Sequence, residues 1–146
     1  MLLVNAVNTE GRPLEIFVKD GRIAAVGQEL EALAGDNETV VDAGGLTVLP
    51  AFVDLHCHWR TPGFEYKEDI ETGSRAAAGY TFVNLMPNTK PVCSSAAQAM
   101  QVEQKAAEVG LCDVNQTVSI TENFDGVSID HLKTLPASVK FITEDG

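Results

Sequence analysis

The sequence predicts an α/β protein in which a β-rich amino-terminal segment precedes the first half of a (β/α)8 barrel. Residues 1–47 contain short strand-like runs and turns, whereas from Val48 onward apolar strands alternate with helices. Four strand–helix units can be counted in residues 48–146, and a complete barrel usually needs about 250 residues. We therefore expect two domains, residues 1–47 and residues 48–146, the second being an incomplete barrel.

The amino-terminal segment carries a strong hairpin signal. Asp20-Gly21 separates two β-rich runs within residues 14–27, and this dipeptide favours the tight turn that joins antiparallel strands. Residues 38–50 add another short strand and a Gly-Gly turn, while helical periodicity is weak and confined to residues 27–35. So few short strands need a partner sheet.

The first strand and helix of the barrel-like part follow. Residues 48–56 form a continuous apolar run, which is typical of a parallel strand buried on both faces. A helix is expected in residues 66–79, with Gly79 ending it. The residues that share its predicted apolar face are Ile70, Gly73, Ser74, Ala77 and Ala78.

The remaining elements continue the alternation. The second strand is expected in residues 81–86 and the clearest helix in residues 95–110, where Ser95 and Gln98 form a capping-box pattern and Gly110 ends the helix. A third strand in 113–120, a short helix in 128–135 and a fourth strand in 138–143 complete the prediction.

Composition excludes several functional classes. The net charge of −11 and the pI near 4.5 argue against a nucleic-acid or anionic-membrane partner, because phosphate contacts need clustered Lys and Arg. No apolar run approaches the roughly 20 residues of a membrane span, and no signal peptide is recognisable, so a cytoplasmic location is expected. Cys57, Cys93 and Cys112 form no C-x-x-C pair and are expected to be reduced thiols.

Two histidines end the first barrel-like strand. His56 and His58 are two residues apart, so strand alternation projects them from one face, with Asp54 one pleat deeper and Cys57 facing the other side. Such a pair can bind a divalent ion, most plausibly zinc, or can simply be two ordinary histidines at a strand end. Position favours the metal site, because barrel enzymes gather their active sites at the carboxyl ends of strands. Asp54 is expected to support the site or the core.

Residues 50–92 carry a family resemblance. The order D-x-H-x-H-x-R, then P-G, then K-E-D-I-E-T-G, and later M-P-N-T resembles dihydroorotase of the amidohydrolase superfamily. The amino-terminal strands are similar to part of the small β-sandwich of these enzymes, and residues 139–146 to their fourth barrel strand. Trp59 departs from the family, which usually has Leu or Phe there.

The resemblance implies roles for individual residues. His56 and His58 would bind the more buried of two zinc ions, Arg60 would hold the substrate carboxylate through a bidentate pairing, and Asn88 would hydrogen-bond the same carboxylate. Without the resemblance, Arg60 reads as a surface ion-pair partner and Asn88 as a turn residue.

The fourth strand offers three candidates for the ligand that bridges the metals. The family uses a carboxylated lysine or an aspartate there; Asp145 matches the dihydroorotase form, Lys140 matches the lysine, and Glu144 is the alternative if the register slips by one residue. We favour Asp145. His131, in the expected short helix, is interpreted as a surface or capping residue.

The implied reaction is the zinc-dependent, reversible opening of dihydroorotate to N-carbamoyl-aspartate in pyrimidine biosynthesis. No catalytic acid or base is identifiable in these residues; the family takes it from the later strands of the barrel, so the chain is expected to be a truncated piece, inactive alone. The expected partners are the small-molecule substrate and either further copies of the chain or the remainder of the same barrel. Two alternatives remain: a related hydantoinase, dihydropyrimidinase or allantoinase, and a non-catalytic half-barrel that binds a partner chain.

Overall fold

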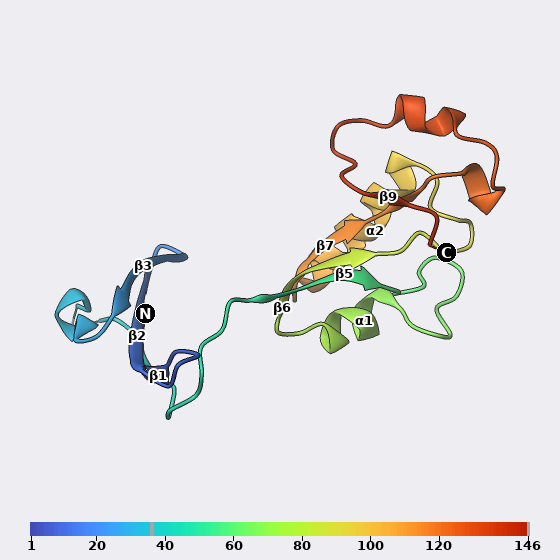
Figure 1. Ribbon diagram of the computed structural model, residues 1–146. Helices are drawn as coiled ribbons and strands as arrows, with labels where there is room; N and C mark the ends of the chain where they lie inside the picture. Colours follow the sequence, from blue (N-terminus) through green and yellow to red (C-terminus); the bar gives the residue numbers. More distant parts are fainter. Residues whose placement is uncertain (36, 146) are drawn as a thin grey trace. The chain divides into compact units, whose positions relative to one another are not determined.

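The computed structural model describes residues 1–35 and 37–145, and the chain folds into two units. Met1–Pro50 forms the first and Ala51–Gly146 the second. Figure 1 labels both α-helices and most of the strands of the two units. Among the described residues, no helix has the length and apolar character that crossing a membrane requires.

The first unit is a four-stranded sheet with the order β3-β2-β1-β4. Strand β1 pairs with β2 antiparallel and with β4 parallel, and β2 pairs with β3 antiparallel. The elements are β1 Leu2–Val7, β2 Pro13–Lys19, β3 Arg22–Gly27, the 3-10 helix η1 Leu30–Leu33 and β4 Val40–Asp42. The weak helical periodicity of residues 27–35 thus corresponds to a single short 3-10 turn.

The predicted hairpin is confirmed. Lys19 pairs with Arg22 across a two-residue loop, and both loop residues have positive φ, 52° at Asp20 and 71° at Gly21. A type I′ turn needs two positive φ values, which Asp tolerates and Gly adopts freely. The sequence signal and the backbone geometry therefore agree.

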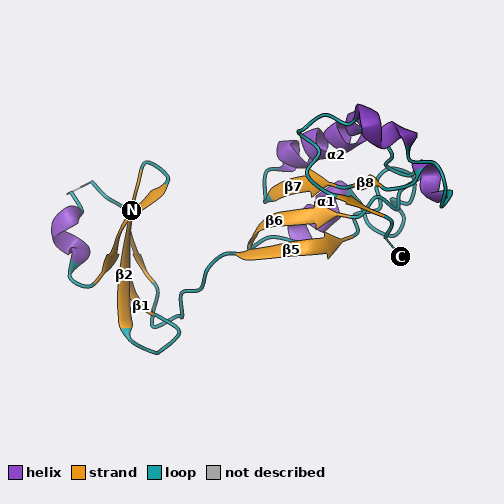
Figure 2. Cartoon of the chain, turned by 45° about the horizontal axis from the view of Figure 1, so that its top comes forward, coloured by secondary structure: helices purple, strands orange, loops and turns teal. Residues whose placement is uncertain are grey.

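The second unit is built on three parallel strands with both helices on one face. Figure 2 shows β5, β6 and β7 side by side, as the ladder pairing requires. Its elements are β5 Phe52–Cys57, α1 Ile70–Ala76, β6 Tyr80–Leu85, α2 Ala96–Val109 and β7 Asp113–Gln116. Both helices share one apolar core with β6, consisting of Trp59, Ile70, Val83, Leu85, Val102 and Ala106.

Both helices begin at the residues that their capping patterns indicate. The Asp69 carboxylate accepts from the N–H of Thr72 at 2.8 Å, and the Thr72 hydroxyl accepts from the N–H of Asp69 at 3.2 Å, which completes a capping box. Ser95 caps α2, and Gly110 ends it with a φ of 68°. Helix α1 ends at Ala76, before Gly79, so Ala78 of the expected apolar face is exposed.

The later strands are shorter than expected. The predicted third strand divides at Thr117 into β7 and β8 Val118–Ser119, and the predicted fourth strand is reduced to β9 Ile142–Thr143. Strands β8 and β9 pair parallel in a small sheet of their own. Between them lie two 3-10 helices, η2 Glu122–Phe124 and η3 Asp130–Thr134.

The prediction that the first barrel-like strand is buried on both faces was wrong. Strand β5 is the edge of its sheet, and Phe52, Val53 and Leu55 are each more than half exposed. The helices pack on the face that carries Val83 and Leu85 of β6, whereas Val53 and Leu55 alternate onto the other face, where the described residues leave them exposed. The apolar residues of β5 indicate a strand that can pack on both faces, and the described residues cover only one of them.

Gly73 permits the close approach of Trp59 to α1. A Cβ at position 73 would lie 2.4 Å from the Cδ1 atom of the indole, and the Trp59 side chain is 5% exposed. The large indole of Trp59 is therefore accommodated by the absence of a side chain at this position of the facing helix.

We predict that Gly73→Ala destabilises the protein by about 1–3 kcal/mol, because the added methyl overpacks the core and outweighs the higher helix propensity of alanine. Urea unfolding of the variant measures this loss, and Glu71→Ala on the exposed face of α1 is the control. Trp59→Leu should relieve the clash, so the double variant should be less destabilised than the two single losses combined. Strict additivity would contradict the proposed contact.

Candidate metal centre

His56, His58 and Asp145 form the candidate metal centre. Each offers one ligand atom, and the three atoms lie within 4.8 Å of one another. His56 belongs to β5, His58 follows it directly, and Asp145 lies two residues beyond the end of β9. The structure thus brings both predicted histidines together with the favoured fourth-strand candidate, at the carboxyl ends of parallel strands.

The three side chains of this group lie close together but differ in their exposure to solvent. His56 Nε2 lies 3.2 Å from Asp145 Oδ1, while the His56 side chain is 62% exposed and that of Asp145 only 8%. The two imidazole rings are 5.1 Å apart between centroids, with an angle of 71° between their planes. A nearly buried carboxylate beside two neighbouring imidazoles is a donor set that attracts a cation.

Asn88 contacts the second histidine. Its amide oxygen lies 2.9 Å from His58 Nδ1. The sequence predicts for Asn88 only a role toward substrate, so this contact is a finding of the structure. Asn88 follows β6, the neighbour of β5, and parallel neighbours end at the same edge of a sheet. That rule could have predicted that Asn88 lies near His58, but not that the two side chains form a hydrogen bond.

The two rival candidates lie outside the group and have other partners. Glu144 accepts hydrogen bonds from the backbone N–H of Thr121 at 2.8 Å and from the Thr121 hydroxyl. The Lys140 ammonium is exposed and donates to the carbonyl of Ala137 at 2.9 Å. The side chain of Glu144 therefore ties the segment after β9 to the end of β8 and leaves the neighbouring Asp145 to face the histidines.

Arg60 is positioned by the loop that follows β5. Its backbone is left-handed, with a φ of 55°, and its side chain is half-buried. Among the described residues the Arg60 guanidinium forms no hydrogen bond or ion pair. The surface ion pair that the sequence left open for Arg60 is therefore not formed within this part of the chain.

The loops that carry Arg60 and Asn88 are joined to each other. The N–H of Lys90 donates to the carbonyl of Pro62 at 2.8 Å. At Gly63, where φ is 96°, a Cβ would lie 2.3 Å from the carbonyl oxygen of Lys90. Only glycine permits this approach, so the two loops form one connected rim.

Asp54 and Cys57 are not placed as strict alternation predicts. The pairing of β5 with β6 shifts between these two residues, and both line a cavity of about 290 Å³ on the α1 side, together with His58 and Gly73. Asp54 therefore does not lie below the histidines, and its carboxylate accepts from the backbone N–H of His56 at 3.0 Å. Burial, with smaller effects of Asp54 and Cys112, raises the pKa of Cys57 to about 12, so this thiol stays protonated near neutral pH.

His131 is remote from the candidate centre. Its Nε2 atom lies 3.0 Å from the carbonyl oxygen of Ser119, and the ring is part-buried against the end of β8. The expectation of a surface or capping histidine did not include this contact, through which His131 joins η3 to the end of β8. It contributes no atom to the group of three potential ligands.

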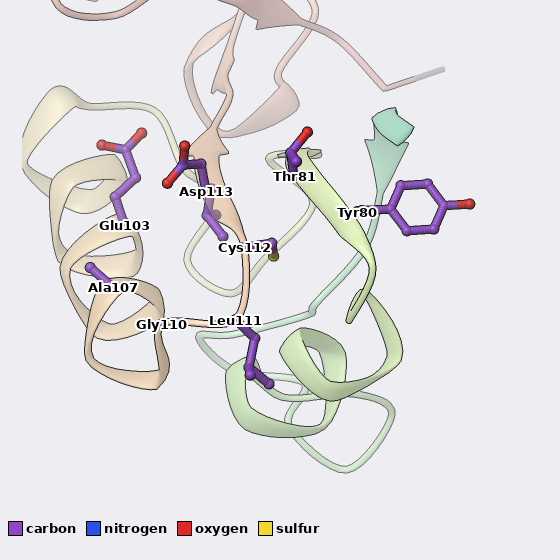
Figure 3. Close-up of a pocket in the computed structure, with 9 residues that line it drawn as sticks. Tyr80, Thr81, Glu103, Ala107, Gly110, Leu111, Cys112 and Asp113 are labelled. Carbon is purple, nitrogen blue, oxygen red and sulfur yellow. The ribbon is translucent and has the colours of Figure 1, made fainter. Parts of the chain in front are cut away.

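A larger cavity lies at the other end of the sheet. It measures about 670 Å³ and opens at the amino ends of β6 and β7, where its lining includes Tyr80, Thr81, Glu103, Cys112 and Asp113 (Figure 3). Active sites of α/β proteins form at the carboxyl ends of the strands. Size alone therefore does not make this cavity the functional site, and the histidine pair lies at the chemically expected end.

Comparisons with known proteins give a consistent picture. Residues 45–146 match a family model described as Dihydro-orotase-like. The dihydroorotase of Clostridium botulinum is 44% identical over 136 residues, which cover 90% of this chain and 33% of the relative. The dihydroorotase of Mycobacterium tuberculosis is 42% identical over 142 residues, which cover 94% of this chain and 33% of the relative. The chain thus spans about a third of the length of the curated relatives it matches.

Two solved structures share the fold. An L-hydantoinase (dihydropyrimidinase) from Arthrobacter aurescens matches with a TM-score of 0.66 at 23% identity, covering 84% of this chain and 28% of that one. An amidohydrolase matches with a TM-score of 0.52 at 18% identity, covering 80% of this chain and 31% of that one. At these identities the matches speak for the fold alone.

Thr121 is the residue near the centre that sequence reasoning missed, because its partner Glu144 is far away in the chain. We predict that Thr121→Val destabilises the protein by about 1–3 kcal/mol, since the half-buried Glu144 carboxylate and the N–H of Gly126 both lose the hydroxyl as a partner. Thr121→Ser should restore most of the loss. Thr134→Val, which removes an exposed hydroxyl, is the control and should change the free energy of unfolding by less than about 0.5 kcal/mol. Equal losses in both valine variants would argue against the role of Thr121.

Proposed function

Because the chain belongs to the dihydroorotase-like family, we propose that it contributes the first metal ligands and the substrate-anchoring residues of a zinc-dependent cyclic amide hydrolase that interconverts dihydroorotate and N-carbamoyl-aspartate. The observation that carries the proposal is the convergence of His56, His58 and Asp145. Since the chain spans about a third of its curated relatives, we assign the activity to a longer protein that contains these residues.

The donor set fits zinc. Two imidazole nitrogens and a carboxylate oxygen, all within 4.8 Å of one another, are donors that zinc commonly takes at catalytic sites. Cys57 is not one of the three residues whose ligand atoms lie together. His56, His58 and Asp145 would hold the ion.

The chemistry is hydrolysis of a ring amide. Bound zinc would lower the pKa of water toward neutrality and polarise the carbonyl. The water oxygen would bond to the carbonyl carbon and the ring C–N bond would break. One of the two water protons would pass to the nitrogen and the other would be released, which leaves a carboxylate. The proton-transferring group is expected outside these residues.

The substrate would be held by its existing carboxylate. The Arg60 guanidinium has no partner among the described residues, and its planar donors match a carboxylate in a bidentate pairing. The amide group of Asn88 lies on the adjacent loop, which is joined to that of Arg60 through Lys90 and Pro62. A carboxylate anchor of this kind favours dihydroorotate over hydantoins and dihydropyrimidines, whose rings lack that group.

The finer structural assignments belong to the same proposal. We propose that Ala51–Gly146 is the first part of a (β/α)8 barrel and Met1–Pro50 part of a β-sandwich. The exposed apolar face of β5 supports this, because closing a barrel would cover it. A second zinc ion would need ligands from outside the described residues.

Activity tests the substrate assignment. In the full-length protein loaded with zinc, Arg60→Ala should lower kcat/KM for dihydroorotate by about 10- to 100-fold, because it removes a charge-assisted hydrogen-bonded pair with the substrate carboxylate. Arg12→Ala, which removes an exposed arginine of the first unit, is the control and should retain full activity. A panel of hydantoin, dihydropyrimidine and allantoin should be turned over poorly. Efficient hydrolysis of one of these in place of dihydroorotate would refute the substrate assignment.

Zinc binding tests the ligand assignment without reference to activity. We expect Asp145→Ala to weaken zinc binding by more than about 100-fold. The loss of a ligand should lower the affinity more than is usual when a residue hydrogen-bonded to a ligand is removed. Lys140→Ala should leave the affinity unchanged, because that side chain is exposed and bonded to Ala137. Competition with a chromophoric chelator measures both affinities. The reverse ranking would identify Lys140 as the ligand.

A further inference from the structure

The contact between His58 and Asn88 joins a candidate metal ligand to a candidate substrate-binding residue. From its geometry we propose that the bond from His58 Nδ1 to the Asn88 amide couples the two sites: zinc bound to His58 orients the Asn88 amide for an anionic ligand, and the ligand in turn favours zinc. This inference rests on the proposed function and deepens it, since it assigns to Asn88 a positioning role toward the metal.

The contact with Asn88 determines which ring nitrogen of His58 carries the proton. The atom that lies 2.9 Å from His58 Nδ1 is an amide oxygen, which only accepts hydrogen bonds. Nδ1 must therefore carry the proton, and the lone pair of a neutral His58 ring is then on Nε2. Asn88 thus selects the tautomer in which Nε2 is the metal-binding nitrogen.

The same contact determines the orientation of the Asn88 amide. Because its oxygen is committed to His58, the two N–H donors of Asn88 point away from the ring, and among the described residues they have no acceptor. The opposite amide orientation would place an N–H group against Nδ1, which would then have to be the acceptor. A ring that binds zinc through Nε2 in that state would have no proton on either nitrogen, so zinc binding excludes it.

The backbone around Asn88 is held in place on both sides. Pro87 and Thr89 are buried, the Thr89 hydroxyl donates to the carbonyl of Pro91 at 2.7 Å, and the N–H of Cys93 donates to the carbonyl of Pro87 at 3.0 Å. With the backbone fixed, the amide has little freedom beyond its two orientations. The choice between these orientations is the two-state element on which metal and ligand both act.

The ligand class follows from the donors. Two amide N–H groups on one loop and the free Arg60 guanidinium on the joined loop form a site for a carboxylate. Coupling is reciprocal, so zinc should raise the affinity for such an anion by the factor by which the anion raises the affinity for zinc.

Two substitutions of Asn88 separate the two roles. Asn88→Asp keeps an acceptor for the Nδ1 proton but places a negative charge where the anion binds. Asn88→Ala removes both functions. In the full-length protein we expect Asn88→Ala to weaken zinc binding by about 10- to 100-fold, the range typical of a residue that orients a histidine ligand. Asn88→Asp should bind zinc at least as tightly as the wild type and lose affinity for N-carbamoyl-aspartate in calorimetry.

Two controls accompany these variants. Asn37 is exposed in the first unit, and its substitution by Asp or Ala should change neither affinity. Nitrogen NMR of the zinc-free protein gives a readout that needs no metal: the share of the Nδ1–H tautomer of His58 should be larger in the wild type and in Asn88→Asp than in Asn88→Ala. Urea unfolding of the zinc-free variants separates these effects from a loss of folding.

The outcomes distinguish this coupling from the proposed function. Wild-type zinc affinity in Asn88→Ala, or equal weakening in both variants, overturns the coupling while zinc binding through the histidines stands. If His58→Ala binds zinc as tightly as the wild type, then both the coupling and the metal site are wrong.

Discussion

The candidate centre depends on the packing of three parallel strands against two helices that lie on one face of their sheet. Parallel strands joined by right-handed crossovers end at a common edge, so the residues that follow β5 and β6 become neighbours without any local sequence relation. Trp59 links this packing to the chemistry: it is buried in the shared core directly between His58 and Arg60. The indole that stabilises the unit also fixes the backbone that presents both polar residues.

The face of the sheet away from the helices has a different character. Asn84 is 5% exposed, donates to the carbonyl of Leu55 at 3.2 Å, and accepts from Asn115 at 2.7 Å and from Thr117 at 3.1 Å. These polar groups are almost fully satisfied by one another, as burial demands. A cross-strand network of this kind locks the register of β5, β6 and β7, and register decides which residues reach the edge of the sheet.

Much of the secondary structure could be predicted, because its signals are local. The Asp20-Gly21 turn, the Ser95 cap and Gly110 each act within a few residues. The placement of Asp54 could not be predicted, since a shift of pairing with β6 overrides the alternation of β5. Likewise the exposure of β5 is a property of what surrounds it and cannot be read from its apolar residues.

The choice among the three fourth-strand candidates shows the same limit. Sequence spacing left Lys140, Glu144 and Asp145 open, and the structure distinguishes their surroundings by a long-range contact, because Thr121, two residues beyond β8, engages Glu144. His56 and Asp145 likewise meet from distant parts of the chain. An ion held by both would bind the folded chain, where the two residues lie close together, and not the unfolded chain, where about 90 residues separate them. The binding free energy of the metal would then add to the stability of the fold, so that chelation would lower the free energy of unfolding even in a protein with no substrate present.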